Sequence, residues 1–172
     1  FLKNQLKRFR HSICSVSVCM LILLQHAIAQ SEIDLNRTDG KYNIARQVTY
    51  FNDTAHTLSI KQVAAPEFHS KFTPIEKNIF FGGITSSAHW FHFKIKNNDP
   101  ARKQWYLLLD FAQTGHIDLY DRTLGDSVLL YRTGFLFPFA QRPVTASPFA
   151  FPISNTDTTA HDYYMRVFTN RT

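Results

Sequence analysis

Side chains that could recognise a ligand recur at every second position in three short segments of the chain. In an extended chain, this spacing places them on one face of a strand. Flat aromatic rings stack on the C–H surfaces of sugars, and neighbouring polar groups bind hydroxyls. The pattern therefore predicts a ligand surface, with a carbohydrate as one candidate ligand. The residues concerned are Trp90, His92, Tyr106, Asp110, Tyr164 and Arg166.

A structural role is the alternative for the same residues. Large aromatic side chains belong to the core more often than to ligand platforms. Trp90 could pack beneath a loop or against a second sheet. Arg166 could form a structural ion pair with Asp110 or Asp118.

Arg142 is a further candidate, in a loop bracketed by Pro138 and Pro143. The two prolines restrict the backbone and remove hydrogen-bond donors. The guanidinium presents donors in a fixed fork that suits a carboxylate. Arg142 could therefore bind a ligand, or it could clamp the loop to the edge of the fold.

Neither catalysis nor metal binding is indicated. His89 and His92 are three residues apart and fall on opposite faces of a strand, and there is no HExxH motif. There is no G-x-S-x-G elbow either. Asp110 and Asp118 could face each other as in a glycosidase, but among thirteen acidic residues such a pair arises by chance. We expect no catalytic residue, no metal and no cofactor.

The elements that position these residues are predicted to be short strands. Alternating apolar and polar residues favour half-buried strands, and few long helical patterns separate them. The fold class expected is an all-β, jelly-roll-like antiparallel sandwich. A short helix is predicted over 58–64, with Thr57 as its cap and Pro66 after its end. The predicted strands cover 48–51, 89–96, 105–111, 116–120, 127–132, 149–153 and 163–169.

The first 29 residues have the features of a signal peptide. A basic start precedes an apolar run over 13–24, and Ala27-Ile28-Ala29 suits cleavage before Gln30. This run of twelve residues, broken by Ser15 and Ser17, is shorter than the ~20 apolar residues that span a bilayer. Both cysteines lie in this segment, so no disulfide is expected beyond it. We expect a polar lead-in over 30–43 and one exported domain over 44–170.

The charge of the remaining chain is nearly balanced. Residues 30–172 carry fifteen Lys and Arg against thirteen Asp and Glu, and the basic residues are dispersed. A groove for nucleic acid would need a basic patch or stripe. No nucleic-acid partner is expected.

The order and spacing of several blocks resemble a known family. The blocks are Tyr50 with Asp53, 58–63, 72–74, Phe81-Gly82 ahead of Trp90 and Phe93, Asn97, Trp105 with Leu107 and Leu109, 117–120, Thr133-Gly134, 138–143, 149–153 and 164–167. Together they are similar to the type 2 extracellular domain of 7TM-DISM receptors, which are bacterial seven-transmembrane receptors with diverse intracellular signalling modules. The sequence departs from the family pattern at Phe135, where an acidic residue is common, and at His92, where an arginine is common.

The resemblance implies a periplasmic domain with a fold similar to carbohydrate-binding modules. In such receptors a membrane region and a cytoplasmic output follow, often a histidine kinase or a diguanylate cyclase. We therefore expect a ligand-sensing domain, cut off before its transmembrane region, on the periplasmic face of the inner membrane. Its expected partners are a small molecule or glycan and its own downstream transmembrane region. The alternatives are a secreted carbohydrate-binding module and a protein-docking module that uses residues 135–139 as an exposed apolar loop.

Overall fold

The computed structural model describes residues 31–36, 40–82, 85–99, 101–102, 104–123, 125–154 and 157–169. The predicted signal peptide lies outside these residues. Within them, strands predominate and the helices are short. The helical elements are η2 (Ala45–Gln47), α2 (Ile60–Val63), η3 (Pro66–Lys71) and η4 (Phe139–Gln141).

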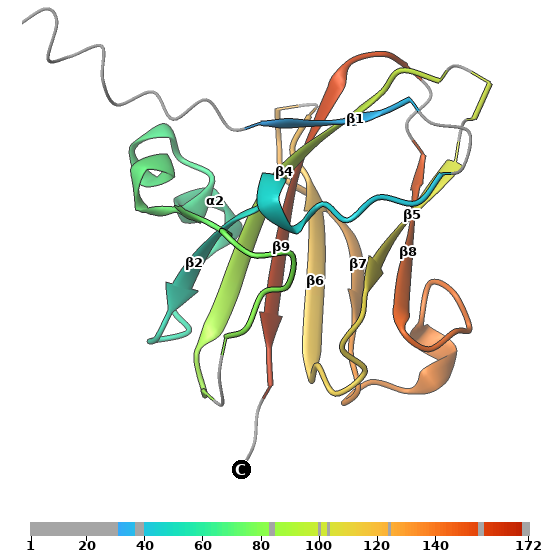
Figure 1. The fold of residues 1–172 in the computed structure, drawn as a ribbon. Helices are drawn as coiled ribbons and strands as arrows, with labels where there is room; N and C mark the ends of the chain where they lie inside the picture. The colour runs from blue at the N-terminus through green and yellow to red at the C-terminus, as the bar shows by residue number, and fades with distance from the viewer. Residues whose placement is uncertain are drawn as a thin grey trace, which may run out of the picture.

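The larger of two sheets forms one layer of the molecule (Figure 1). Its strands follow the order β3 (Thr73–Pro74), β2 (Thr49–Asp53), β4 (Ala88–Asn97), β9 (Ala160–Phe168), β6 (His116–Asp121) and β7 (Val128–Thr133). Neighbours along this path are antiparallel. In addition, β1 (Glu32–Leu35) pairs in parallel with the last residues of β4.

The second layer is a two-stranded sheet of β5 (Gln104–Leu109) and β8 (Phe149–Ser154). Its inner side chains, such as Trp105 and Phe151, pack against those of the large sheet. The Tyr131 hydroxyl on β7 also donates a hydrogen bond to the Pro152 carbonyl at 2.9 Å. Together the two layers enclose the main core of the sandwich.

The central strand β4 is buried on both faces, whereas its sequence predicts burial of one face and a ligand surface on the other. Phe91, Phe93 and Ile95 enter the main core between the sheets. Trp90 points to the opposite, outer face of the large sheet, where it belongs to a second apolar cluster. That cluster forms because α2 and η3 cross this face and place Val63 and Phe68 over it.

The expected all-β sandwich and its strands are confirmed, with two local differences. β1 lies within the segment predicted to be only a polar lead-in, because Ile33 and Leu35 alternate into the core. The helix begins at Ile60 with Ser59 as its cap, so Thr57 as the cap is wrong. Ser59 and Gln62 form a capping box, while the Asp53 carboxylate already accepts the backbone N–H of Thr57.

Candidate functional site

The structure brings Trp90, His92, Tyr164 and Arg166 together on the outer face of the large sheet. Trp90 lies directly opposite Arg166 on the neighbouring strand, and His92 lies opposite Tyr164. This proximity follows from the antiparallel register of β4 and β9, combined with the alternation of side chains along each strand.

Trp90 and Tyr164 lie beneath the segment formed by α2 and η3. Trp90 is only 1% exposed, and Tyr164 is fully buried in the same cluster. The indole ring of Trp90 also stacks on Tyr120, with ring centroids 6.0 Å apart. In this arrangement neither ring offers an open face to a ligand.

His92 and Tyr164 belong to a polar network at the edge of that cluster. His92 Nε2 lies 2.6 Å from an Asp162 carboxylate oxygen, and its ring stacks on Tyr164 at 4.2 Å. The Tyr164 hydroxyl lies 3.1 Å from His69 Nε2. Burial raises the pKa of Tyr164, so its phenol keeps its proton. Burial and the neighbouring His92 lower the pKa of His69, so its neutral ring can accept the phenol's hydrogen bond.

Arg166 lies at the border between the covered and the open part of the outer face. Its guanidinium carbon is 5.7 Å from the centroid of the Trp90 ring and 4.7 Å from that of Phe168. One terminal nitrogen donates to the His56 carbonyl at 3.3 Å. Among the described residues, its buried Nε has no hydrogen-bond partner, and neither does the Trp90 Nε1. Trp105 Nε1 and Arg142 Nε are also without a partner among the described residues, but Trp90 and Arg166 lie side by side on neighbouring strands. Buried donors without acceptors are uncommon in folded proteins.

Arg166 does not form the expected structural ion pair. Asp118 lies opposite Arg166 in the sheet, but its carboxylate is held by Arg132 on the other side. Arg132 donates from Nε at 2.8 Å and from Nη2 at 3.3 Å to the two carboxylate oxygens. This two-point contact orients the Arg132 guanidinium and raises the pKa of Arg132.

The part of the outer face that α2 and η3 leave open carries aromatic rings, guanidiniums and a carboxylate. We call it the β6–β7–β9 surface, and it comprises His116, Asp118, Tyr120, Arg132, Arg166 and Phe168. Tyr120 and Arg132 were not among the candidates from the sequence. For Tyr120 the signal was present in the alternation of residues 116–120, the same pattern that singled out Trp90 and His92, whereas Arg132 lies on β7, next to Asp118 in the register.

Tyr106 and Asp110 lie apart from this surface. Trp105 and Leu107 on β5 point into the main core, so Tyr106 between them points outward from the small sheet, on the opposite side of the sandwich. Asp110 follows β5 and is exposed. The structure therefore separates the predicted residues into different layers.

Arg142 is engaged within its own loop. Its guanidinium lies 4.6 Å from the ring of Phe139 and 4.3 Å from that of Phe149, and Nη1 donates to the Ala146 carbonyl at 2.8 Å. These contacts join the loop that contains η4 to the first residue of β8. They are the contacts that a structural clamp would make.

Two absences apply to the part of the chain that the structure describes. No group of three His, Cys, Asp or Glu side chains there is arranged to hold a metal ion. No helix there combines the length and hydropathy that crossing a bilayer requires.

Comparison with known proteins identifies the family. No curated protein and no solved structure matches the chain significantly. The family model described as 7TMR-DISM extracellular 2 matches residues 45–172, which is most of the chain and includes all the strands of the large sheet except β1. The two-layer sandwich and the order of its blocks agree with the resemblance seen in the sequence. The chain belongs to the 7TMR-DISM extracellular 2 family.

Proposed function

We propose that this domain is the periplasmic ligand-sensing part of a membrane signal-transduction receptor. We propose further that its ligand, a small molecule or a glycan, binds the β6–β7–β9 surface. The observation that carries the second proposal is Arg166, whose buried Nε has no acceptor beside the equally unpartnered Trp90 Nε1.

Unsatisfied buried donors favour a ligand with oxygen acceptors. Leaving a buried donor without a partner costs about 1–3 kcal/mol, which an acceptor on a ligand would recover. The Arg132–Asp118 contact uses Nε and Nη2 of Arg132, so Nη1 is directed away from that pair. Tyr120 adds a half-buried aromatic ring next to these groups. A hydroxyl-rich or carboxylate-bearing ligand with an apolar face would complement such a surface.

The position of Arg166 suggests how binding becomes a signal. Arg166 lies two residues before Phe168, the last residue of β9. A ligand held there would act on the polypeptide that leaves this strand. If the ligand binds one arrangement of the domain and the membrane region more tightly, it shifts the population toward that arrangement. No chemistry in the sandwich is needed.

The experiment is a thermal-shift screen of residues 30–172 against monosaccharides, sugar acids and small dicarboxylates. Each ligand found is then titrated against Arg166→Gln and against Arg46→Gln. Arg46 is exposed in η2, away from the proposed surface, and serves as the matched control. We expect Arg166→Gln to weaken binding at least tenfold and Arg46→Gln to leave it unchanged. Unchanged affinity in Arg166→Gln would place the site elsewhere.

A docking module is the second candidate, and one observation favours it. The loop after β7 exposes Phe135 and Phe139 instead of burying them, as a contact surface would. A secreted carbohydrate-binding module remains the other alternative. Sequencing the gene beyond Thr172 separates the proposals, because a receptor requires apolar membrane segments and a freestanding module does not.

A further inference from the structure

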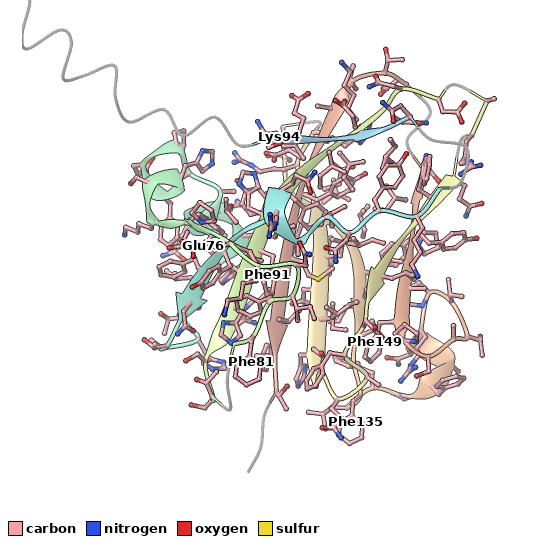
Figure 2. The ribbon with its side chains drawn as sticks, viewed as in Figure 1. Glu76, Phe81, Phe91, Lys94, Phe135 and Phe149 are labelled. Carbon is pink, nitrogen blue, oxygen red and sulfur yellow. The ribbon has the colours of Figure 1, made fainter. Side chains whose placement is uncertain are left out.

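Three separate loops at one end of the sandwich expose apolar side chains. The loops precede β4, connect β5 to β6, and connect β7 to β8. Phe81 is 89% exposed and Phe135 is 63% exposed, and both lie at the lower end of the molecule in Figure 2, opposite Lys94. We call this the apolar end, and its exposed apolar residues are Ile79, Phe81, Phe111, Phe135, Leu136 and Phe139.

Charged residues occur in the loops at both ends, but not next to Phe81 and Phe135 in the chain. The described loops at the opposite end, between β4 and β5, β6 and β7, and β8 and β9, carry Asp99, Arg102, Arg122, Asp126 and Asp157. The three loops of the apolar end carry Glu76, Lys77, Asp110 and Arg142 within their described residues, and Figure 2 shows Glu76 well away from Phe81 and Phe135. Arg142 is turned onto the rings of Phe139 and Phe149. The segments that carry Phe81, Phe135 and Phe139, residues 78–82 and 134–141, contain no charged residue.

Backbone contacts hold two of these loops in a fixed arrangement. The Phe135 N–H donates to the Thr114 carbonyl at 2.7 Å, and the Leu136 N–H donates to the Gly115 carbonyl at 3.2 Å. Gly134 has a φ of 145°, and a Cβ there would lie 2.0 Å from the Gly115 carbonyl oxygen. The loops are thus joined edge to edge, with the Phe135 side chain directed outward. Preorganised apolar groups on a surface favour binding, because little ordering entropy remains to be lost.

The end of β9 identifies the neighbour of this surface. β9 runs toward the apolar end and finishes there at Phe168, whose ring stacks on His116 at 4.3 Å (Figure 1). Polypeptide that follows β9 leaves the sandwich from this end. In the membrane receptor proposed above, the polypeptide that leaves this end would lead to the bilayer.

We propose that the apolar end rests on the lipid bilayer, with Phe81, Phe135 and Phe139 in the headgroup region. Phe, Leu and Trp side chains of interfacial segments insert into the boundary between headgroups and acyl chains, whereas charged groups are costly inside the bilayer. Protein interfaces also use exposed aromatic side chains. We favour the bilayer because β9 ends at this surface, which places the membrane region of the proposed receptor next to it. The inference rests on the proposed membrane receptor and is independent of the ligand surface.

The test measures lipid contact at defined positions. Residues 30–172 contain every residue of both core clusters, so this portion retains the whole described core. It is attached by a hexahistidine tag after Thr172 to phosphatidylcholine vesicles that contain a nickel-chelating lipid. Phe81→Trp and Phe135→Trp report contact through quenching by brominated acyl chains. Tyr106→Trp, at a position 54% exposed on the small sheet, is the matched control.

The native tryptophans contribute a constant background, since Trp90 is 1% and Trp105 8% exposed. We expect brominated lipid to reduce the added emission of F81W and F135W roughly twofold and to leave that of Y106W unchanged. Absence of quenching in F81W and F135W would overturn the proposal, as would equal quenching in all three proteins. If those two tryptophans are instead shielded in a dimer seen by sedimentation, the surface docks protein. Loss of ligand binding in Arg166→Gln is measured separately, so the two proposals fail independently.

Discussion

Replacing Trp90 by alanine tests whether the segment of α2 and η3 covers the outer face in solution. The indole is 1% exposed, packs in one cluster with Val63, Phe68 and Tyr164, and stacks on Tyr120. Truncating a buried aromatic side chain removes its transfer free energy and leaves a cavity, at a cost of about 3–5 kcal/mol. Since a domain of this size is stable by about 5–15 kcal/mol, the loss is a large fraction of the total.

The measurement is guanidinium unfolding followed by circular dichroism. For Trp90→Ala we expect a lower midpoint with an unchanged slope, together with a fall in melting temperature of roughly 10 °C. Trp90→Phe should retain most of the stability, because the smaller ring still fills part of the site. Tyr106→Ala, at an exposed aromatic on the other layer, should change the free energy of unfolding by less than about 0.5 kcal/mol.

A small effect at Trp90 would refute the reasoning. If Trp90→Ala loses less than about 1 kcal/mol, the side chain is not held in a packed cluster. The indole would then be accessible in solution, and Trp90 would again be a candidate for binding the ligand.

Three further predictions test local features of the fold. Burial, and after it the charge of a neighbouring histidine, lowers the pKa of His89 below its ordinary value of 6.5. The unfolded chain therefore binds this proton more tightly than the folded domain does, so the free energy of unfolding should fall as the pH drops below 6.5. Between about pH 7.5 and about pH 5.5, the free energy of unfolding measured in urea should fall less in His89→Gln than in the unsubstituted protein. An equal fall in both proteins would contradict the role of His89. Gly134→Ala should destabilise the domain by about 3 kcal/mol or more through its backbone clash, whereas Gly125→Ala, with open space around it, should cost about 1 kcal/mol in thermal unfolding. Ser59→Ala should cost about 1 kcal/mol and Thr57→Ala almost nothing; equal effects in denaturant titrations would exclude the observed cap.

Much of the fold could be predicted because strands have a short-range signature. The alternation in residues 89–96 correctly separates Phe91 and Phe93 from Trp90, since successive side chains on a strand point to opposite faces. Short strands without long helical patterns predicted the all-β sandwich. β1 was missed because its apolar signal consists only of Ile33 and Leu35. A parallel pairing with β4 is a long-range contact that leaves no local pattern.

The candidate site, like the fold, was only partly predictable from the sequence. Sequence alone determined which residues share a strand face, including Trp90 with His92 and Tyr164 with Arg166. Only the tertiary structure decided that Tyr106 belongs to the opposite layer, that Asp118 binds Arg132, and that α2 and η3 cover Trp90. The physical reason is that side-chain alternation depends on neighbours two residues apart. Which layer a strand joins, and what packs over it, depends on contacts between segments far apart in the chain.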